Sequence, residues 1–421
     1  MTASDTHRAI DAVWRIESPR LIAGVARMVR DVGLAEELAQ DALVAALEQW
    51  PESGVPDSPG AWLMAVAKRR AIDLFRRNER LERKLAELGY ASIDHTESDF
   101  DAVLDDTIED DLLRLVFTAC HPVLPMPARV ALTLRLLGGL TTDEIGRAFL
   151  VAESTIAQRI VRAKRSLAQA RVPFEVPQGD ERVARLPSVL EVIYLVFNEG
   201  YSATAGTDWI RPDLCEEALR LGRILAELMP GEPEVGGLVA LMELQASRFR
   251  ARVGPDGEPI LLLDQDRGRW DQLLIRRGLA ALKRAEALGG TPGPYLVQAA
   301  IAACHARAHT GAETDWARIA ALYGVLAQLA PSPVVELNRA VAVAMADGPS
   351  AGLSLVDALV AEPALRNYHL LPSVRGDLLA RLGRCDEARV EFERAASLAR
   401  NQRERDLLLA RAAAMATSDT G

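Results

Sequence analysis

Apolar residues return every three or four positions through most of this chain, which is the spacing of one buried face of an α-helix. Within residues 7–30 this face is formed by Ile10, Val13, Trp14, Leu21, Val25 and Met28. Ala, Leu, Arg and Glu dominate and only 5% of residues are aromatic, which favours helices over strands. The pattern predicts an all-α protein, and 421 residues suffice for about three domains.

Several classes of protein are excluded by what the sequence does not contain. No stretch approaches the ~18 apolar residues of a membrane span, and the polar N-terminus does not resemble a secretory signal, so we expect a cytoplasmic protein that does not contact membrane. No Gly-rich phosphate loop, nucleophile elbow or metalloprotease motif occurs. We therefore expect no enzyme activity and no cofactor.

The cysteines also argue against a metal centre. Cys120, Cys215, Cys304 and Cys385 are far apart in sequence and form no Cys-x-x-Cys pair, which predicts reduced, buried thiols. His305 and His309 beside Cys304 have helical spacing that could seat zinc, but no further ligand lies nearby in sequence. Histidines in the core or on the surface are the favoured interpretation, and no metal is expected.

Charge is strongly segregated within the first 171 residues, although the whole chain has a net charge of −10. Residues 64–84 carry eight basic side chains, and residues 153–171 carry five against the single Glu153. Between them, residues 92–111 contain nine carboxylates and no Lys or Arg, which predicts a segment unable to fold alone. Two basic helices therefore flank an acidic linker.

Helical periodicity and turn residues divide the chain into four parts. Helices are expected over 7–30, 34–50 and 61–77, with a loop at 51–60 where Pro and Gly gather. The predicted organisation is listed by residue range: a helical bundle at 7–80, the acidic flexible linker at 81–111, a second helical module at 112–171, and a long helical domain at 180–415.

The second module carries the signature of a helix-turn-helix. Thr141 and Glu144 have the spacing of a capping box, in which Thr141 caps the helix and Glu144 reaches back. This short helix ends near Phe149, and a basic helix follows from about Glu153 to Ala170. The arrangement predicts a DNA-reading motif. A plain helical hairpin with a solvated basic face is the alternative.

Four stretches resemble parts of the extracytoplasmic-function sigma factors of bacteria. Residues 35–47 (AEELAQDALVAAL) and 61–77 (AWLMAVAKRRAIDLFRR) are similar to region 2 of that family. Residues 140–149 (LTTDEIGRAF) and 154–167 (STIAQRIVRAKRSL) are similar to its region 4. The remainder, with 197–202 (FNEGYS) and 213–218 (DLCEEA), resembles the subgroup that carries a long tetratricopeptide-like (TPR-like) C-terminal extension.

The resemblance implies which region 4 residues contact the −35 promoter element. The base-facing positions fall on Ala157, Gln158, Val161 and Arg162. Gln158 can pair with adenine and Arg162 with guanine, whereas Ala157 and Val161 could touch only a thymine methyl group. Phosphate contacts are expected from Thr155, Arg159, Lys164 and Arg165, and Arg162 could also belong to this set. Ala152 and Ala157 depart from the usual Ser cap and the common basic residue.

The resemblance also assigns roles within region 2. The loop at 52–60 would receive a base flipped from the −10 element, and the backbone of the opened strand would be held by Lys68, Arg69, Arg70, Arg76 and Arg77. Trp62 could stack on a base, but its place on an apolar stripe favours core packing. The surface that docks on core polymerase would be an exposed acidic face made of Glu36, Glu37, Gln40 and Asp41. The acidic linker could occupy a basic channel of polymerase or act as a spacer.

From Leu186 onward, helices alternate with Gly- and Pro-rich turn signals. The clearest repeat is 375–399, where Gly376, Leu379, Ala388 and Phe392 fall at the small and bulky positions of a TPR. Such repeats leave a concave surface for a protein or peptide partner. The polar stretch 198–202 could be a ligand site, a domain contact or a capped turn.

The combined expectation is a sigma factor that binds core RNA polymerase and promoter DNA, with the C-terminal helical domain controlling it. An autonomous helix-turn-helix regulator with a sensing domain is the alternative, although no dimerisation helix is evident. A third possibility is a helical-repeat enzyme or sensor with a small-molecule site near 198–213.

Overall fold

The computed structural model describes residues 3–87, 108–149, 151–202, 210–255 and 258–417. In these ranges the regular structure is helical apart from isolated bridges, one of which joins Val253 and Pro259, and this confirms the all-α prediction. The chain divides into two compact units, Met1–Ile193 and Tyr194–Gly421. Among the described helices, none is long and apolar enough to cross a membrane.

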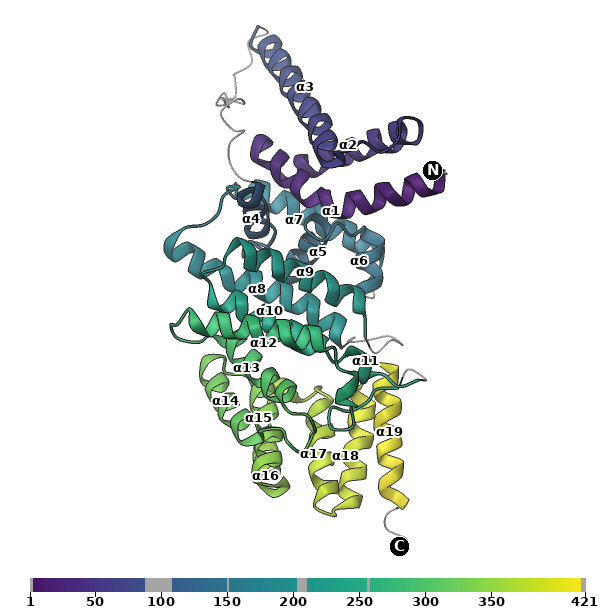
Figure 1. Cartoon of the computed structure of the whole chain (residues 1–421), viewed down its shortest axis with the longest axis vertical. Helices are drawn as coiled ribbons and strands as arrows, with labels where there is room; N and C mark the ends of the chain where they lie inside the picture. The colour runs from purple at the N-terminus through teal and green to yellow at the C-terminus, as the bar shows by residue number, and fades with distance from the viewer. Residues whose placement is uncertain (1–2, 88–107, 150, 203–209, 256–257, 418–421) are drawn as a thin grey trace. The chain divides into compact units, whose positions relative to one another are not determined.

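The first unit joins both predicted N-terminal modules. Its helices are α1 (Ala3–Val29), α2 (Val32–Ser53), α3 (Pro59–Glu87), α4 (Ile108–Ala119), α5 (Met126–Leu136), α6 (Thr142–Phe149), α7 (Glu153–Gln169) and the first part of α8 (Gly179–Tyr201), as Figure 1 shows. Helix α1 packs against α2, α3 and α4. Alanines with no exposed surface, including Ala23, Ala26 and Ala39, let these helices approach closely.

The helices of the first unit extend beyond their predicted ends. Helix α2 continues through Pro51 to Ser53, because a proline in the last turn removes only one helical hydrogen bond. Helix α3 begins at Pro59, a residue suited to a first turn, and continues to Glu87 rather than ending at Arg77. Of the predicted loop at 51–60, only residues 54–58 lie between the two helices.

The acidic linker differs from its prediction at both ends. Helix α3 includes residues 81–87, and α4 takes in the last residues of the acidic run, among them Asp111. Asp111 is buried, with 3% of its surface exposed, because Arg27 and Arg114 bind its carboxylate. Residues 88–107, which hold the rest of the linker, lie outside the described ranges.

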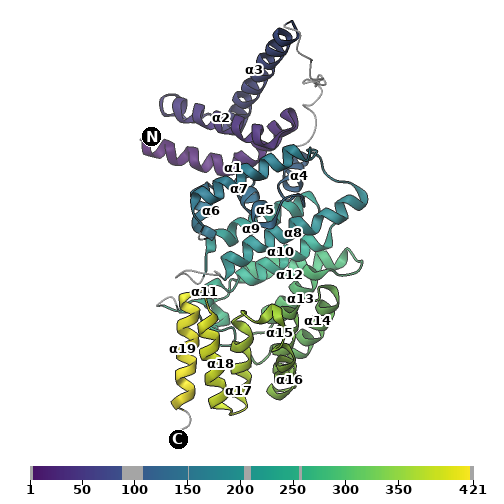
Figure 2. The same ribbon diagram turned by 180° about the vertical axis from the view of Figure 1, so that it is seen from behind.

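The second unit consists of successive helical pairs (Figures 1 and 2). Its elements after α8 are α9 (Pro212–Leu228), α10 (Pro233–Ala246), α11 (Phe249–Arg252), η2 (Arg267–Arg269), α12 (Gln272–Ala287), α13 (Pro294–Arg307), α14 (Trp316–Leu329), α15 (Pro333–Asp347), α16 (Pro349–Leu359), η3 (Pro363–Leu365), α17 (Leu370–Arg381), α18 (Cys385–Leu398) and α19 (Gln402–Thr417). Helices α17, α18 and α19 lie side by side in Figure 2.

The predicted repeat at 375–399 coincides with the α17–α18 pair. A Cβ built on Gly376 would lie 2.9 Å from the ring of Phe392, so the two helices can pack this closely only with glycine there. Phe392 belongs to a core shared with α15, α16 and α19. The helical pair is therefore confirmed, and the assignment to TPRs stays a prediction.

The boundary between the two units falls inside α8, not near residue 180 as expected. Arg185 donates to the Phe117 carbonyl oxygen at 2.9 Å, and Ser188 donates to that of Cys120 at 2.7 Å. These bonds satisfy carbonyls near the end of α4, where the helix leaves them without internal partners. The first part of α8 therefore belongs to the first unit.

Candidate nucleic-acid and polymerase interfaces

The capping box at the start of α6 forms as the sequence predicts. The backbone N–H of Glu144 donates to Thr141 Oγ1 at 3.1 Å, and the backbone N–H of Thr141 donates to Glu144 Oε2 at 2.8 Å. Thr142 Oγ1 donates to Glu153 Oε1 at 2.8 Å, which ties the start of α6 to the start of α7. These bonds fix where the motif begins and how its two helices meet.

The turn between α6 and α7 depends on Gly146, which the helical pattern of the sequence does not mark. The Val151 N–H donates to the Gly146 carbonyl oxygen at 2.9 Å. A Cβ on Gly146 would lie 2.7 Å from the Val151 carbonyl oxygen, closer than a side chain tolerates. A glycine seven residues before the start of a predicted recognition helix is the available signal.

Helix α7 has one buried and one exposed face. Its buried face consists of Ile156, Ile160, Ala163 and Leu167. The opposite face exposes Gln158, Val161 and Arg162, and 56% of the Val161 surface is open to solvent. Most residues expected to read bases thus share one accessible surface, at the spacing that a helix in the major groove requires.

The other predicted −35 residues are less uniformly accessible. Arg165 is exposed, whereas Thr155, Ala157, Arg159 and Lys164 are half-buried. Ala152 makes no side-chain capping bond, so α7 begins without the cap that a Ser there would supply.

Glu36 lies in the core, and its expected exposure on the acidic face is wrong. Only 3% of its surface is exposed, because Arg135 Nε binds Glu36 Oε1 at 2.7 Å and Lys164 binds the other oxygen. A buried carboxylate needs such partners to offset its lost hydration. The contact joins α2 of the first predicted module to α5 and α7 of the second.

The rest of the predicted docking face is divided. Glu37 and Asp41 are exposed, and Gln40 is half-buried and donates to Glu36 Oε1 at 2.7 Å. Asp41 also pairs with Arg70 on α3 at 2.9 Å. The face available to a partner is therefore narrower than the sequence predicts.

Two further ion pairs link the modules within this unit. Arg15 on α1 binds Glu144, the residue of the capping box that reaches back to Thr141, at 2.7 Å, and 66% of the Arg15 side chain is exposed. Arg27 on α1 binds Asp111 on α4 at 3.2 Å, where both side chains are largely buried. The two modules are thus joined by one exposed ion pair and by three that are largely buried.

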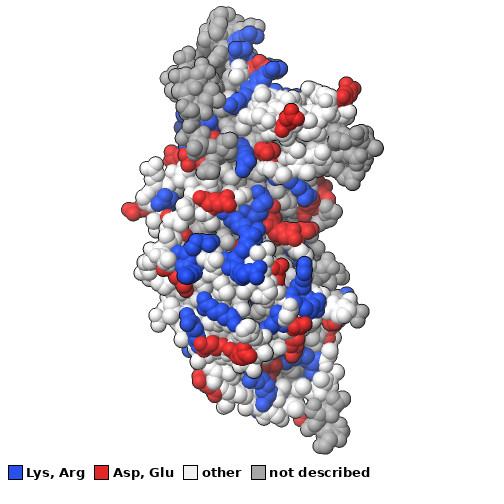
Figure 3. Space-filling model, in the orientation of Figure 1, with Lys and Arg blue, Asp and Glu red and all other residues white. Residues whose placement is uncertain are grey.

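The predicted −10 residues lie along α3. Arg69, Arg76 and Arg77 are exposed, while Lys68 and Arg70 are half-buried. Figure 3 shows basic side chains along α3, whereas elsewhere on this face both signs of charge are interspersed. Among the described residues no carboxylate forms an ion pair with Arg69, Arg76 or Arg77, so within this part of the chain they can reach a phosphate backbone without breaking one.

Trp62 packs against another tryptophan. Its ring meets that of Trp50 edge to face, with centroids 5.3 Å apart, and Trp50 is 1% exposed. Trp62 itself is half-buried. The geometry favours the packing interpretation, since this aromatic pair already occupies one side of the ring.

The cysteine thiols are largely shielded from solvent. Burial raises the pKa of Cys120 to about 11, and its thiol lies 3.4 Å from Thr133 Oγ1. Cys215 and Cys304 are also buried, as predicted, and Cys385 is half-buried. In the described part of the chain, no group of three His, Cys, Asp or Glu residues could hold a metal ion.

The polar stretch 198–202 belongs to the end of α8 and its first following residue. Glu199 pairs with Arg211 at 2.8 Å, and the Phe197 and Tyr201 rings stack 5.7 Å apart. Residues 203–209 of the small-molecule site considered above lie outside the described ranges.

Three parts of this chain match models of known protein families. Residues 14–81 match the family model "Sigma-70 region 2", residues 114–167 match "Sigma-70, region 4", and residues 185–286 match a "Family of unknown function (DUF6596)". An uncharacterized protein of Rhizobium meliloti (strain 1021) is 46% identical over 94% of this chain and 93% of its own length.

Relatives with an assigned role match the N-terminal part. The ECF RNA polymerase sigma factors SigK of Mycobacterium tuberculosis (strain ATCC 25618 / H37Rv) and Mycobacterium ulcerans (strain Agy99) are each 34% identical over 152 residues. The match covers 35% of this chain and 78% of each relative.

Proposed function

This chain belongs to the ECF family of RNA polymerase sigma factors, which direct transcription initiation, and we propose that contacts between its own two sigma regions gate that activity. Core RNA polymerase and promoter DNA are the partners that membership implies. A sigma factor performs no covalent chemistry. Its task is to present one surface to polymerase and others to two promoter elements.

Region 4 is proposed to read the −35 element through α7. Gln158, Val161 and Arg162 form the accessible base-reading face, and Arg165 extends it toward phosphate. Arg162 offers a fork of donors that matches guanine, and Gln158 offers a donor and an acceptor that match adenine. Each good bidentate pair contributes about 1–3 kcal/mol of discrimination against a wrong base.

Region 2 is proposed to hold the opened −10 strand along α3. Arg69, Arg76 and Arg77 are exposed and supply the phosphate contacts that offset the few kcal/mol of unstacking. Lys68 and Arg70 extend this surface, and Arg70 does so by exchanging Asp41 for a phosphate. The short loop before α3 is proposed to receive the flipped base.

The contact at Glu36 is the observation that carries the gating proposal. Glu36 lies on the proposed polymerase-docking helix, and Lys164 lies on the proposed DNA-reading helix. Because these two residues bind each other, one contact withholds both from their external partners. Polymerase could then recruit the chain only when the two sigma regions separate. Because polymerase would bind the separated form more tightly than the packed form, it would shift the equilibrium toward separation.

The C-terminal unit is proposed to set how readily the regions separate. Helix α8 supports this role, since it contributes to the first unit through Arg185 and Ser188 and then continues into the second. A ligand or protein that binds the second unit could therefore act on the regions through a continuous helix. A protein or peptide partner for the helical pairs belongs to the same proposal.

Run-off transcription tests the proposed function. The full chain is added to purified core polymerase on a template that carries the promoter upstream of its own gene. Initiation that depends on the added protein supports the proposal. Specific binding to the promoter duplex without polymerase, together with no initiation, would instead support an autonomous regulator.

A further inference from the structure

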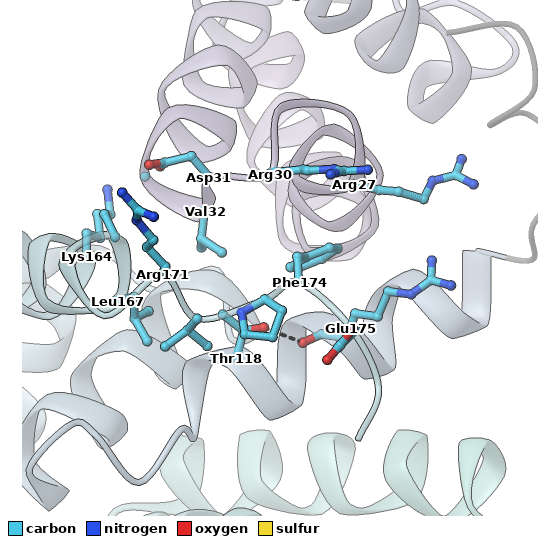
Figure 4. A pocket seen from close by; sticks show the side chains of 15 residues that line it. Arg27, Arg30, Asp31, Val32, Thr118, Lys164, Leu167, Arg171, Phe174 and Glu175 are labelled. Carbon is cyan, nitrogen blue, oxygen red and sulfur yellow. Dashed lines mark hydrogen bonds between the residues drawn. The ribbon is translucent and has the colours of Figure 1, made fainter. Parts of the chain in front are cut away.

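A cavity of about 1130 Å³ lies inside the first unit, where the ends of α1 and α7 meet (Figure 4). Its walls come from the end of α1, the α1–α2 turn, α4, the last turns of α7 and residues 171–175. The base-reading residues of α7 do not line it. Of the residues expected to contact the promoter, only Lys164 lines the cavity, so the two sites share a single side chain.

The charge of the lining is predominantly positive. Five cations line it against two carboxylates, and the cations are Arg27, Arg30, Arg114, Lys164 and Arg171. The two carboxylates belong to Asp31 and Glu175, and Asp31 already accepts the Leu34 N–H at 2.8 Å as the cap of α2.

The five cations differ in how they are neutralised. Arg27 and Arg114 both bind Asp111, and Lys164 binds Glu36. In the described part of the chain, no carboxylate pairs with Arg30 or Arg171. Two guanidinium groups at this cavity thus keep their donors available to a ligand.

Arg30 and Arg171 also share an unusual backbone conformation. Their φ angles are +53° and +48°, and among the described residues other than glycine they alone have positive φ. Each residue closes a helix: the Arg30 N–H donates to the Ala26 carbonyl oxygen, and the Val172 N–H to that of Leu167. Glycine is the usual residue at such a position because a Cβ is strained there.

The helix dipole alone does not explain both arginines. A cation near a helix C-terminus is stabilised by the helix dipole. A basic residue in the preceding turn would gain the same stabilisation without adopting a positive φ angle. Both strained positions instead place a guanidinium at the same cavity. Strained backbone conformations that persist in a folded protein cluster at binding and active sites.

We propose that this cavity binds a phosphorylated small molecule of nucleotide size. Guanidinium groups match phosphate oxygens in pairs, so Arg30 and Arg171 would hold phosphates from different parts of the lining, with Lys164 beside Arg171 (Figure 4). Leu167, Val172 and Phe174 supply an apolar wall for the rest of the ligand. Inorganic phosphate alone would leave most of the volume unfilled, since organic ligands occupy sites of ~300–1,000 Å³.

The ligand would stabilise the packing of the two sigma regions, because its contacts come from α1 and α7 together. A molecule that binds only the packed form shifts the equilibrium toward it and raises the melting temperature. This inference does not depend on transcription, since direct binding by the full chain tests it.

Isothermal titration of the full chain with ATP, and separately with inorganic triphosphate, tests the proposal. We expect ATP to bind and to raise the melting temperature, with triphosphate binding at least about tenfold more weakly because it cannot use the apolar wall. No binding of ATP at millimolar concentration would overturn the proposal, and so would equal affinity for triphosphate.

Substitution by glycine separates binding from folding. Arg30→Gly and Arg171→Gly relieve the strained backbone, so neither should lower the melting temperature, while each weakens ATP binding about tenfold or more. The control Arg20→Ala removes an exposed cation of α1 outside the cavity and should leave binding unchanged. Unchanged ATP affinity in both glycine variants, or an equal loss in the control, would overturn the assignment.

Discussion

At the scale of single residues, Glu36 shows what this sequence does and does not reveal. Its neighbours Glu37 and Asp41 are exposed as the helical pattern predicts, but Glu36 is buried by Arg135 and Lys164. These partners lie about a hundred residues further along the chain. Periodicity assigns a residue to a face, but it cannot identify the element that covers that face.

The burial of Glu36 predicts a large cost for removing its charge. In Glu36→Gln, the half-buried side chains of Arg135 and Lys164 lose the carboxylate that neutralises them both. Breaking a buried ion pair in this way costs about 3 kcal/mol. We expect the free energy of unfolding to fall by about that amount in urea titrations. Glu37→Gln, one position away and exposed, is the control and should change it by no more than ~0.5 kcal/mol. If the two variants lowered the free energy of unfolding equally, that result would contradict the burial of Glu36 in an ion pair.

His305 predicts a pH dependence of the second unit. Burial, and then the nearby Arg248, lower its pKa from 6.5 to about 3. The unfolded chain therefore binds a proton that the folded chain does not, so stability is lost as the pH falls from about 6.5 toward 3. One such proton changes the free energy of unfolding by up to about 1.4 kcal/mol per pH unit.

The variant His305→Gln checks this dependence. Urea titrations at several pH values should show a shallower loss of stability for the variant than for the natural chain between pH 6 and 4. Parallel pH profiles of the two proteins would contradict it.

At the scale of elements, local signals predict helix starts better than helix ends. The capping box at Thr141 and Glu144 forms as expected because all of its parts lie within four residues. The apolar pattern predicts the end of α3 ten residues too early, because charged residues continue the helix beyond the last apolar position of that pattern. The local pattern does not predict the role of Gly146, because glycine is required there by the close approach of the Val151 carbonyl oxygen.

The two helix starts of the helix-turn-helix make opposite predictions. Thr141→Ala removes an observed cap and should destabilise the protein by about 1 kcal/mol. Ala152→Ser adds the cap that α7 lacks and should stabilise it by up to about 1 kcal/mol. Urea titrations check both, and a loss of stability in Ala152→Ser would contradict the capping argument.

At the scale of the whole molecule, the family motifs allowed the two sigma regions and the helical C-terminal part to be predicted from the sequence. The division into units was not predictable. The sequence indicates separate modules joined by an acidic linker, whereas the two modules form one compact unit that also takes in part of α8. Its buried ion pairs join residues that no local pattern connects.

The affinity of the full chain for core RNA polymerase tests the gating account most directly. Arg135 holds Glu36 but belongs to neither proposed promoter-binding surface, so Arg135→Ala should release the docking helix and increase affinity about tenfold. Arg15→Ala breaks only an exposed pair and is the matched control, with little change expected. Circular dichroism confirms that both variants are folded. A folded Arg135→Ala protein whose affinity for core polymerase equals that of the natural chain would contradict the account.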